Sequence, residues 1–275
     1  GRASEARGPA RTPPCGAAGT APAPITRRTP PERRIEDLVK LILEHLDELA
    51  KGALITLAIF ACSLVIATVG GLVIGALRLT RIKIVRAAAW LYVEFFRGVS
   101  VIALLFWAFY VLPTFGLSMT AFVTAVVVIG LNQSAFIGEV VRGGIQAVPV
   151  GQYEASIAIN LSSWQRFRSV ILPQALPISI PPYANQVINT LKETAVVSLI
   201  GIAELTFVAM DLRMRIGYSI PILVGIAVVY LLLAYLFTKL LSWLENRVRV
   251  EPTMKSKAQQ QRTWRLRDLL GTGAR

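Results

Sequence analysis

The stretch that decides the fold is ALITLAIFACSLVIATVGGLVIGAL, residues 53–77. It contains no charged side chain and lies between Lys51 and Arg78. Because an α-helix rises about 1.5 Å per residue, roughly 20 apolar residues cross the ~30 Å hydrocarbon core of a bilayer. The stretch therefore predicts a transmembrane helix, and the chain is expected to be a membrane protein.

The composition of the whole chain agrees with this prediction. Hydrophobic residues make up 54% of the sequence and charged residues 16%, whereas a soluble domain carries about 25% charged residues. The net charge of +13 does not indicate nucleic acid, because Lys and Arg collect in the cytoplasmic loops and tails of membrane proteins. We expect membrane lipid around the spans and no nucleic acid partner. Cys15 and Cys62 are far apart, so neither a disulfide nor a metal site is expected.

Further stretches have the length and composition of membrane spans. Residues 98–138 carry no charge but are too many for one helix. The turn-forming sequence LPTFG at 112–116 divides them into two helices, of which the first is short and is expected to borrow residues from the preceding AAAWLYVEFF. The predicted additional spans are 98–112, 118–138 and 217–238.

Charge placement predicts a fifth span and the orientation. The loop 78–97 and the tail after residue 238 are both rich in Lys and Arg, so both are expected in the cytosol. Four spans would put the tail on the wrong side, and a fifth at about 186–208 restores agreement. The run 169–191 contains four prolines and is not expected to be one straight helix. The predicted fold is an all-α integral membrane protein with five transmembrane helices, the N-terminus outside and the C-terminus in the cytosol.

The regions around the spans differ in character. Residues 1–34 are rich in Ala, Arg, Gly and Pro and predict a disordered N-terminal extension. Residues 35–52 have apolar residues on one stripe and predict an amphipathic helix on the membrane surface. The membrane domain is expected at 53–247, followed by a cytosolic basic tail at 248–275.

On this topology a polar segment, QYEASIAINLSSWQRFRSVILP at 152–173, lies in the cytosolic loop 139–185. Apolar residues recur at helical spacing on both sides of NLSS (160–163), where Ser162 or Ser163 can cap a helix. The segment predicts two short amphipathic helices at an angle, ended by a proline. Physical reasoning alone leaves open whether they lie on lipid headgroups or bind a protein, and Arg166 and Arg168 are expected to face lipid phosphates or an acidic partner.

This segment resembles the EAA loop of the permease subunits of ABC importers, whose pattern is E-A-A-x3-G-x9-I-x-L-P. Its flanks resemble the polar amino acid branch of that family, the histidine/glutamine-type permeases. The resemblance covers about residues 50–247. The matching stretches are VEFFRG (93–98), GEVVRGGIQAV (138–148), GQYEAS (151–156), RFRSVILPQALP (166–177) and LKETAVVSLIGIAELT (191–206).

The resemblance implies that residues of about 150–173, named here the coupling loop, bind a cytosolic ABC ATPase. Glu154 would pair with a basic group of that ATPase. Two positions depart from the pattern, since Ser156 stands for Ala and Asn160 for Gly. Asn is the residue other than Gly that best tolerates a left-handed backbone, so a positive φ is expected at Asn160. The implied coupling residues are Glu154, Ala155, Ser156, Asn160, Ile171, Leu172 and Pro173.

No nucleotide-binding sequence of the form G-x4-G-K-[ST] is present. The chain is therefore expected to hold no cofactor and no catalytic residue of its own, with ATP bound by the ATPase. The resemblance further implies a second permease chain, identical or different, and an extracytoplasmic solute-binding protein. It implies the cytoplasmic (inner) membrane of a bacterium. The implied solutes are polar amino acids or an amino-acid-like compatible solute such as ectoine.

Polar residues inside the predicted spans are candidates for the solute path, because each ionisable group costs about 2.5–3.5 kcal/mol to insert. Glu204 is expected to face the path and to help bind a cationic or zwitterionic solute. Lys192 and Glu193 either belong to the path or have a structural role, with Lys192 reaching the cytosolic edge and Glu193 a neighbouring loop. Asn132 and Gln133 either hydrogen-bond to another helix or line the path.

Two other classes of membrane protein have sequence patterns of their own. An ion-coupled secondary carrier would have internal repeats and Gly/Pro-interrupted spans in both halves, and a membrane-embedded enzyme would need paired His or carboxylate residues in its spans. The sequence has neither pattern. Gly70, Gly71 and Gly75, in the first span, predict close packing against another helix.

Overall fold

The computed structural model describes residues 45–216 and 219–248, and every regular element in those ranges is helical. The predicted extension 1–34 lies outside the described residues, as do residues 249–275 and most of the predicted surface helix 35–52. The helices, in chain order, are α2 (Leu46–Arg78), α3 (Lys83–Gly98), α4 (Val101–Phe106), η1 (Trp107–Val111), η2 (Leu112–Phe115), α5 (Ala121–Gln146), α6 (Val150–Ala158), α7 (Ser163–Arg166), η3 (Phe167–Ile171), α8 (Leu172–Glu193), η4 (Thr194–Ile200), α9 (Leu205–Ile216) and α10 (Ser219–Val248).

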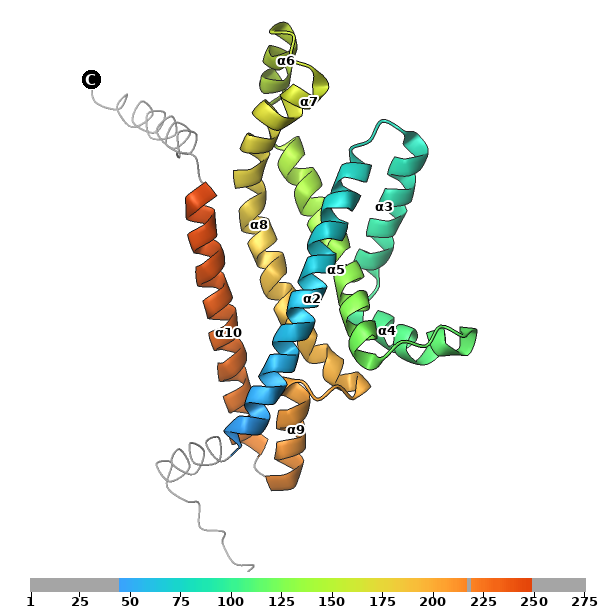
Figure 1. Cartoon of the computed structure of the whole chain (residues 1–275), viewed down its shortest axis with the longest axis vertical. Helices are drawn as coiled ribbons and strands as arrows, with labels where there is room; N and C mark the ends of the chain where they lie inside the picture. Colours follow the sequence, from blue (N-terminus) through green and yellow to red (C-terminus); the bar gives the residue numbers. More distant parts are fainter. Residues whose placement is uncertain (1–44, 217–218, 249–275) are drawn as a thin grey trace, which may run out of the picture.

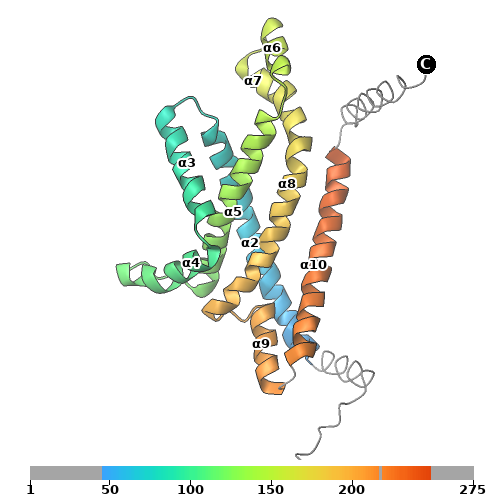
Figure 2. The same cartoon turned by 180° about the vertical axis from the view of Figure 1, so that it is seen from behind.

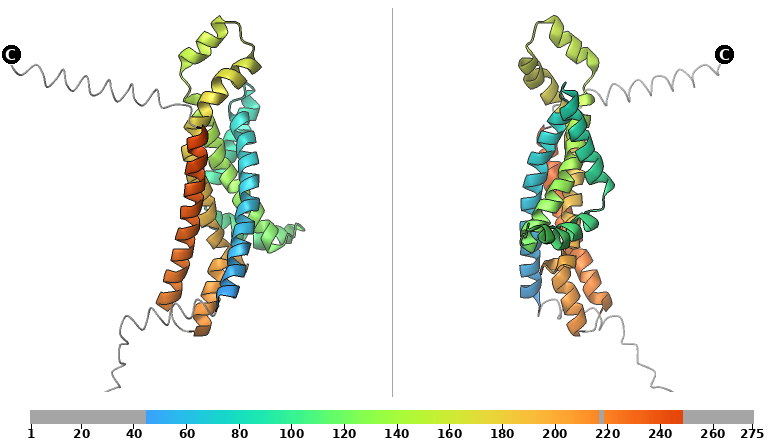
Figure 3. Two further views of the ribbon diagram at one scale, coloured as in Figure 1. Left: turned by 60° about the vertical axis from the view of Figure 1, so that its left-hand side comes forward. Right: turned by 90° about the vertical axis from the view of Figure 1, so that its right-hand side faces the viewer.

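The long helices α2, α5, α8 and α10 run along the long axis of the molecule, with α3 beside α2 and α5 (Figure 1). The short helices α6 and α7 project beyond one end of this bundle, and α9 lies at the opposite end (Figure 2). Seen from the side, α4 extends away from the bundle (Figure 3). The bundle therefore has one end formed by the coupling loop and another formed by α9 and the start of α2.

The number of membrane crossings agrees with the prediction. Three helices, Leu46–Arg78, Ala121–Gln146 and Ile222–Trp243, are each long and apolar enough to cross a bilayer. Two bent pairs also pass, so the count reaches five when each pair is taken as one crossing. The fold is that of an all-α membrane protein, as predicted.

The packing of α2 against α5 forms the centre of the molecule. A Cβ atom on Gly71 would lie 2.5 Å from Ile137 Cγ2, and one on Gly75 would lie 2.8 Å from Val141 Cβ. Such distances leave no room for a side chain, so the glycines allow the two helices to approach closely. The predicted packing role of these glycines is confirmed. Of the 18 most apolar consecutive residues of α5, 67% are buried, whereas the corresponding figure for α10 is 11%. α5 is therefore a central helix and α10 a peripheral one.

The second predicted span is partly right: the expected contribution of the residues before it is borne out, because Lys83–Gly98 passes together with Val101–Phe115 as one bent candidate crossing, but its bounds are wrong. The sequence predicts a helix at 98–112, whereas α3 is the helix that lies beside α2 and α5, and Val101–Phe115 turns away from it by 99°. The charges in 78–97 predict a loop there, although residues 87–96, which lie in α3, are also expected to contribute to the span. One of the charged residues, Arg97, places its guanidinium 5.6 Å from the centre of the Phe136 ring, so a charge count underestimates how well α3 packs in the bundle.

The additional span predicted at 186–208, which is the fourth crossing in chain order, also differs from its predicted bounds. α8 is continuous from Leu172 to Glu193 although it contains Pro177, Pro181 and Pro182. Beyond it the chain forms the 3₁₀ turn η4, which ends at Gly201 with φ 80°. The run 169–191 is not one regular α-helix, since residues 169–171 belong to the π-helical turn η3, but the prolines do not break α8. In a bilayer no water competes for backbone groups, so a helix lacking a few hydrogen bonds remains the best-satisfied backbone.

At the end opposite the coupling loop, α9 packs between the first turns of α2 and α10. Leu212 and Ile222 are buried there, with Leu49 packed against them. Arg215 makes an ion pair with Glu48 at 3.6 Å and a second one with Asp211. α2 starts at Leu46, so residues 46–52 continue the first membrane helix and do not belong to a separate surface helix.

Candidate coupling site and solute path

The coupling loop is a pair of short helices that projects from the bundle (Figures 1 and 3). α6 ends at Ala158, and its last carbonyls are satisfied by a Schellman motif. Asn160 has φ 54° and donates its N–H to Ile157 O at 2.8 Å, while Leu161 N–H reaches Ser156 O at 3.1 Å. The left-handed conformation predicted for Asn160 is confirmed, and it turns the chain sharply after α6.

The next helix begins two residues later with a capping box. Gln165 N–H donates to Ser162 Oγ at 3.3 Å, and Ser162 N–H donates to Gln165 Oε1 at 3.0 Å. Ser162 is thus the cap, one of the two residues proposed from the sequence. Both helix ends that face the turn are hydrogen-bonded locally, so the turn between α6 and α7 is a defined structure rather than a flexible connector.

Arg166 joins the two short helices. Its guanidinium lies 4.5 Å from the centre of the Tyr153 ring on α6 and donates to Leu161 O at 3.2 Å. Arg166 therefore folds back onto its own loop and does not face lipid phosphates or an acidic partner. The side chain of Ser156 is buried and donates to Tyr153 O at 2.6 Å, so a small residue is required at this position of the EAA pattern.

The remaining coupling residues divide into an exposed group and a connecting group. Glu154 and Ala155 are exposed on α6. Ile171, Leu172 and Pro173 lie where the π-helical turn η3 passes into α8. The second helix of the loop does not end at the proline, as the sequence predicts, because α7, η3 and α8 follow one another without a break. The coupling loop is thus joined directly to a membrane helix.

Glu204 does not line a path in this structure. Its side chain is fully buried, and its carboxylate accepts hydrogen bonds from Thr56 Oγ1 at 3.1 Å and Tyr230 OH at 3.1 Å. It also accepts the N–H of Phe207 at 3.0 Å, which caps the start of α9. The prediction that Glu204 faces the solute is wrong, because these donors bind it into a junction of α2, α9 and α10.

Lys192 and Glu193 form the last turn of α8, at the end remote from the coupling loop. Lys192 is exposed, and it lies too far along α8 to reach the edge at which the coupling loop stands. The Gln133 amide of α5 interacts with the Glu193 carboxylate. Gln133 Oε1 and Glu193 Oε2 are nevertheless buried without a hydrogen-bond partner. Two buried acceptors of this kind are costly unless a donor reaches them.

Asn132, next to Gln133, has a different role. It is buried and donates from Nδ2 to Phe96 O at 2.7 Å, near the end of α3. Of the two alternatives predicted for Asn132, a hydrogen bond to another helix and a place in the solute path, the structure bears out the hydrogen bond. Among residues 45–216 and 219–248, no three His, Cys, Asp or Glu side chains lie together as a metal site would require.

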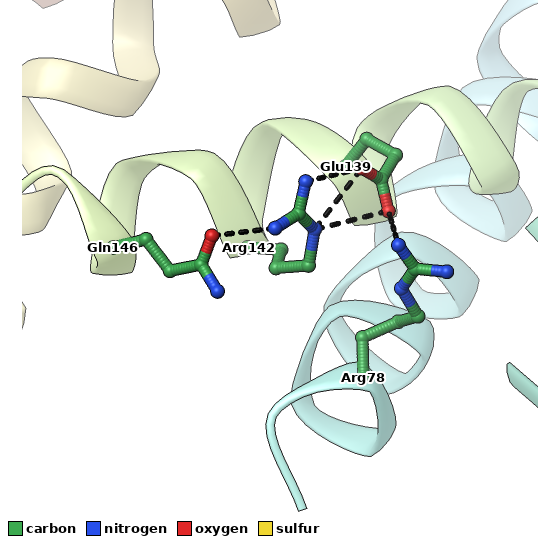
Figure 4. Close-up of polar contacts among 4 residues, drawn as sticks. All are labelled: Arg78, Glu139, Arg142 and Gln146. Carbon is green, nitrogen blue, oxygen red and sulfur yellow. Dashed lines mark hydrogen bonds and ion pairs between the residues drawn. The ribbon is translucent and has the colours of Figure 1, made fainter. Parts of the chain in front are cut away.

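One polar cluster was missed by the sequence analysis. Glu139 of α5 lies between Arg78 of α2, at 3.0 Å, and Arg142, at 2.7 Å (Figure 4). Arg142 also donates to Gln146. The i, i+3 spacing of Glu139 and Arg142 in GEVVRGG is a signal for their ion pair, but no local pattern indicates that Arg78, at the end of another helix, completes the cluster.

Comparison with known proteins identifies the family. Residues 67–250 match the model of the binding-protein-dependent transport system inner membrane component family. The chain belongs to this family. It is a multi-pass permease subunit of the inner membrane, and in ABC importers ATP is hydrolysed by a separate subunit.

Individual relatives support this assignment. The chain is 35% identical over 211 residues to the "Probable amino-acid ABC transporter permease protein y4tF" of Sinorhizobium fredii (strain NBRC 101917 / NGR234), covering 74% of this permease and 89% of the relative. It is 33% identical over 204 residues to the glutamine transport system permease protein GlnP of Escherichia coli (strain K12), covering 74% and 93%. A crystal structure of an amino acid ABC transporter with histidines contains a chain with a TM-score of 0.71 and 32% identity, covering 75% of this permease and 96% of that chain.

Proposed function

We propose that this permease moves polar amino acids, or an amino-acid-like compatible solute such as ectoine, and that its coupling loop binds a cytosolic ABC ATPase. The observation that carries the proposal is a set of exposed apolar side chains on the loop. Because the loop projects beyond the membrane helices, lipid tails do not cover these side chains, and a protein surface is the natural partner. They are Val150 (70% exposed), Ile159 (69%), Trp164 (66%) and Ile157 (47%).

The proposed orientation places the coupling loop in the cytosol, with the N-terminus outside and the C-terminus inside. The turn between α2 and α3 is basic and lies at the same end of the bundle as the coupling loop. Since basic residues favour the cytosolic side, this end is assigned to the cytosol. The other partners proposed are a second permease chain, identical or different, and a solute-binding protein outside the membrane.

The mechanism we infer is alternating access driven by the ATPase. When ATP closes the ATPase pair, the coupling loop moves with it. Because α7, η3 and α8 form one continuous helical path, that movement is transmitted to α8, which packs against α5 and α10. A shift of α8 relative to these helices would open the bundle toward the outside, where the binding protein delivers the solute.

For the solute site we propose the end of α8, with Glu193, Gln133 and Lys192. The two unpartnered oxygens of Glu193 and Gln133 suit the α-ammonium group of an amino acid, which brings three N–H donors. Lys192 is adjacent in sequence and exposed, and it would offer a positive charge to the carboxylate of the same solute. The amino-acid relatives named above support this class of solute.

The substitution Glu154→Lys tests the proposal. Reversing the charge at an exposed position of α6 is expected to lower co-purification of the ATPase subunit and solute uptake by at least about tenfold, because like charges would then meet at the interface. Binding is measured by pull-down from membranes and uptake with a labelled amino acid in cells that express the whole transporter.

The matched control is Gln152→Lys, which introduces the same side chain two residues earlier, on the opposite side of α6. It is expected to leave ATPase binding and uptake close to those of the unmodified chain. Full ATPase binding and full uptake in the Glu154→Lys variant would refute the proposed docking role of the coupling loop.

A further inference from the structure

A basic cavity lies at the end of the bundle that carries the coupling loop, where α2, α3 and α5 meet. Its volume is about 440 Å³, and its lining is strongly cationic. None of the described residues that line it is acidic. The side chains that matter for its chemistry are Arg78, Lys83, Arg86, Trp90, Arg142 and Gln146.

The positive charge of this cavity is not balanced within the described part of the chain. Glu139 is the carboxylate paired with Arg78, at 3.0 Å, and with Arg142, at 2.7 Å (Figure 4). One carboxylate therefore serves two guanidinium groups, and Lys83 and Arg86 add two further charges. Arg78 Nη1 is buried and has no hydrogen-bond partner. A buried cationic donor without an acceptor is costly, so this nitrogen indicates where an anion would bind.

The start of α3 adds to the positive field. Its N-cap residue, Ile82, makes no side-chain hydrogen bond to the helix, and its first turn contains no acidic residue. Lys83 and Arg86 occupy that first turn, although a helix N-terminus carries a partial positive charge and favours acidic side chains. This placement is unfavourable for the helix alone and becomes favourable when an anion binds in front of it.

The surroundings of the cavity indicate an amphiphilic anion. Trp90 follows Arg86 by one helical turn and is 51% exposed, and Trp side chains favour the boundary between headgroups and lipid tails. The next residue along α3, Leu91, is 63% exposed. Cations therefore stand at one end of this helix, and apolar side chains open to the bilayer continue beyond them.

We propose that this cavity binds the phosphate of an anionic phospholipid headgroup. Arg78, Lys83, Arg86 and Arg142 would surround the phosphate, and Trp90 would lie at the level of the glycerol backbone. Basic pockets between membrane helices recognise headgroups in this way. The assignment to the cytosolic leaflet rests on the orientation proposed above, whereas the binding of an anionic lipid does not.

The experiment compares retention of phosphatidylglycerol and phosphatidylcholine. The full-length chain is purified with its co-expressed transporter subunits, incubated with mixed micelles of the two lipids and examined by native mass spectrometry. We expect phosphatidylglycerol to be retained preferentially, and the variant Arg86→Gln to retain about fivefold less of it. The matched control is Arg81→Gln, which removes the same charge from the connection between α2 and α3, at a position that does not line the cavity.

Four results would overturn the proposal. The first is equal retention of both lipids by the unmodified chain, and the second is equal loss in Arg86→Gln and Arg81→Gln. The third is displacement of the lipid by millimolar inorganic phosphate, which would assign the cavity to a soluble phosphate compound. Loss of ATPase binding in Arg86→Gln with unchanged lipid retention would assign it to the partner protein instead. The measurement does not require transport, so its failure leaves the proposed function untouched.

Discussion

The buried polar residues of this permease are of two kinds: those whose hydrogen bonds are satisfied within the protein, and those that keep an oxygen without a partner. Glu204 has donors from three helices and Asn132 donates to a backbone carbonyl, so both hold helices together. Gln133 and Glu193 each keep a buried oxygen without a partner. In a bilayer an unsatisfied polar group costs several kcal/mol. A membrane protein retains such a group when a ligand satisfies it, which is why these two residues remain in the proposed solute site.

At this scale the informative substitution is Glu193→Gln. It preserves the shape of the side chain but removes its charge, and it is expected to lower amino-acid uptake by about tenfold, the effect of losing one hydrogen bond to a charged group. Uptake is measured at several solute concentrations, together with co-purification of the ATPase subunit. The latter is expected to be unchanged, because Glu193 lies at the end of α8 remote from the coupling loop.

Glu94→Gln is the matched control, since Glu94 is exposed on α3 and its change removes the same charge from another helix. Uptake is expected to stay near that of the unmodified chain. If both variants transported equally well, Glu193 would have no part in solute binding.

At the scale of elements, the coupling loop depends on how two helix ends are finished. The Schellman motif at Asn160 and the capping box at Ser162 lie two residues apart and satisfy the backbone on both sides of the turn. The second helix then continues through η3 into α8. Local hydrogen bonds thereby define the turn between α6 and α7, and in the proposed mechanism this turn passes the movement of α6 on to α8.

The substitution Asn160→Val tests this account. A β-branched residue at φ 54° is strained by roughly 1–2 kcal/mol, so amide exchange of the turn is expected to accelerate and the affinity for the ATPase to fall by about tenfold. Asn160→Gly is expected to preserve both properties, because glycine adopts this conformation without strain.

Ile159→Val is the control for amide exchange alone, since Ile159 has φ −94°, which a β-branched residue accepts. Its ATPase affinity is not a control, because Ile159 is one of the exposed apolar side chains proposed to bind the ATPase. Amide exchange of the turn is measured by hydrogen exchange, and affinity for the ATPase is measured by pull-down. Unchanged exchange in Asn160→Val would mean that the turn is not held by its backbone conformation.

At the scale of the whole molecule, the coupling loop is continuous with a membrane helix that packs against its neighbours. α2 and α5 are in close contact along their glycines, and α8 packs on both α5 and α10. No G-x4-G-K-[ST] sequence occurs in the chain, and in ABC importers the separate subunit hydrolyses ATP. In the proposed mechanism the energy for movement enters through the projecting loop.

This arrangement predicts the energy source of transport. Uptake of a labelled amino acid in cells is expected to stop when ATP is depleted and to persist when a protonophore collapses the proton gradient while ATP is maintained. An ion-coupled secondary carrier would show the opposite pattern, because its solute movement follows the gradient directly. The two treatments are applied separately to samples of one culture, and the ATP level and the membrane potential are measured in each sample.

Some features of the fold and site could be predicted from the sequence because they depend on neighbouring residues. The spans in α2, α5 and α10 follow from uncharged runs, and the glycines of the first span predict its close packing. The left-handed turn follows from one Asn at the Gly position of a known pattern, and the cap from the two serines of NLSS (160–163) before the second helix. Each of these features is decided within one or two helical turns.

Other features required the tertiary structure. The prolines of α8 stay in a helix because the bilayer offers the backbone no alternative partner, and α3 takes the place predicted for residues 98–112 although it carries charges. Glu204 is bound by groups from three helices, and Arg78 completes the Glu139–Arg142 pair from another helix. The sequence alone determined which segments are apolar and how single turns end. The partners of the buried charges were decided only by the packing of helices far apart in the chain, because a charge in a membrane is placed by whichever distant group can satisfy it.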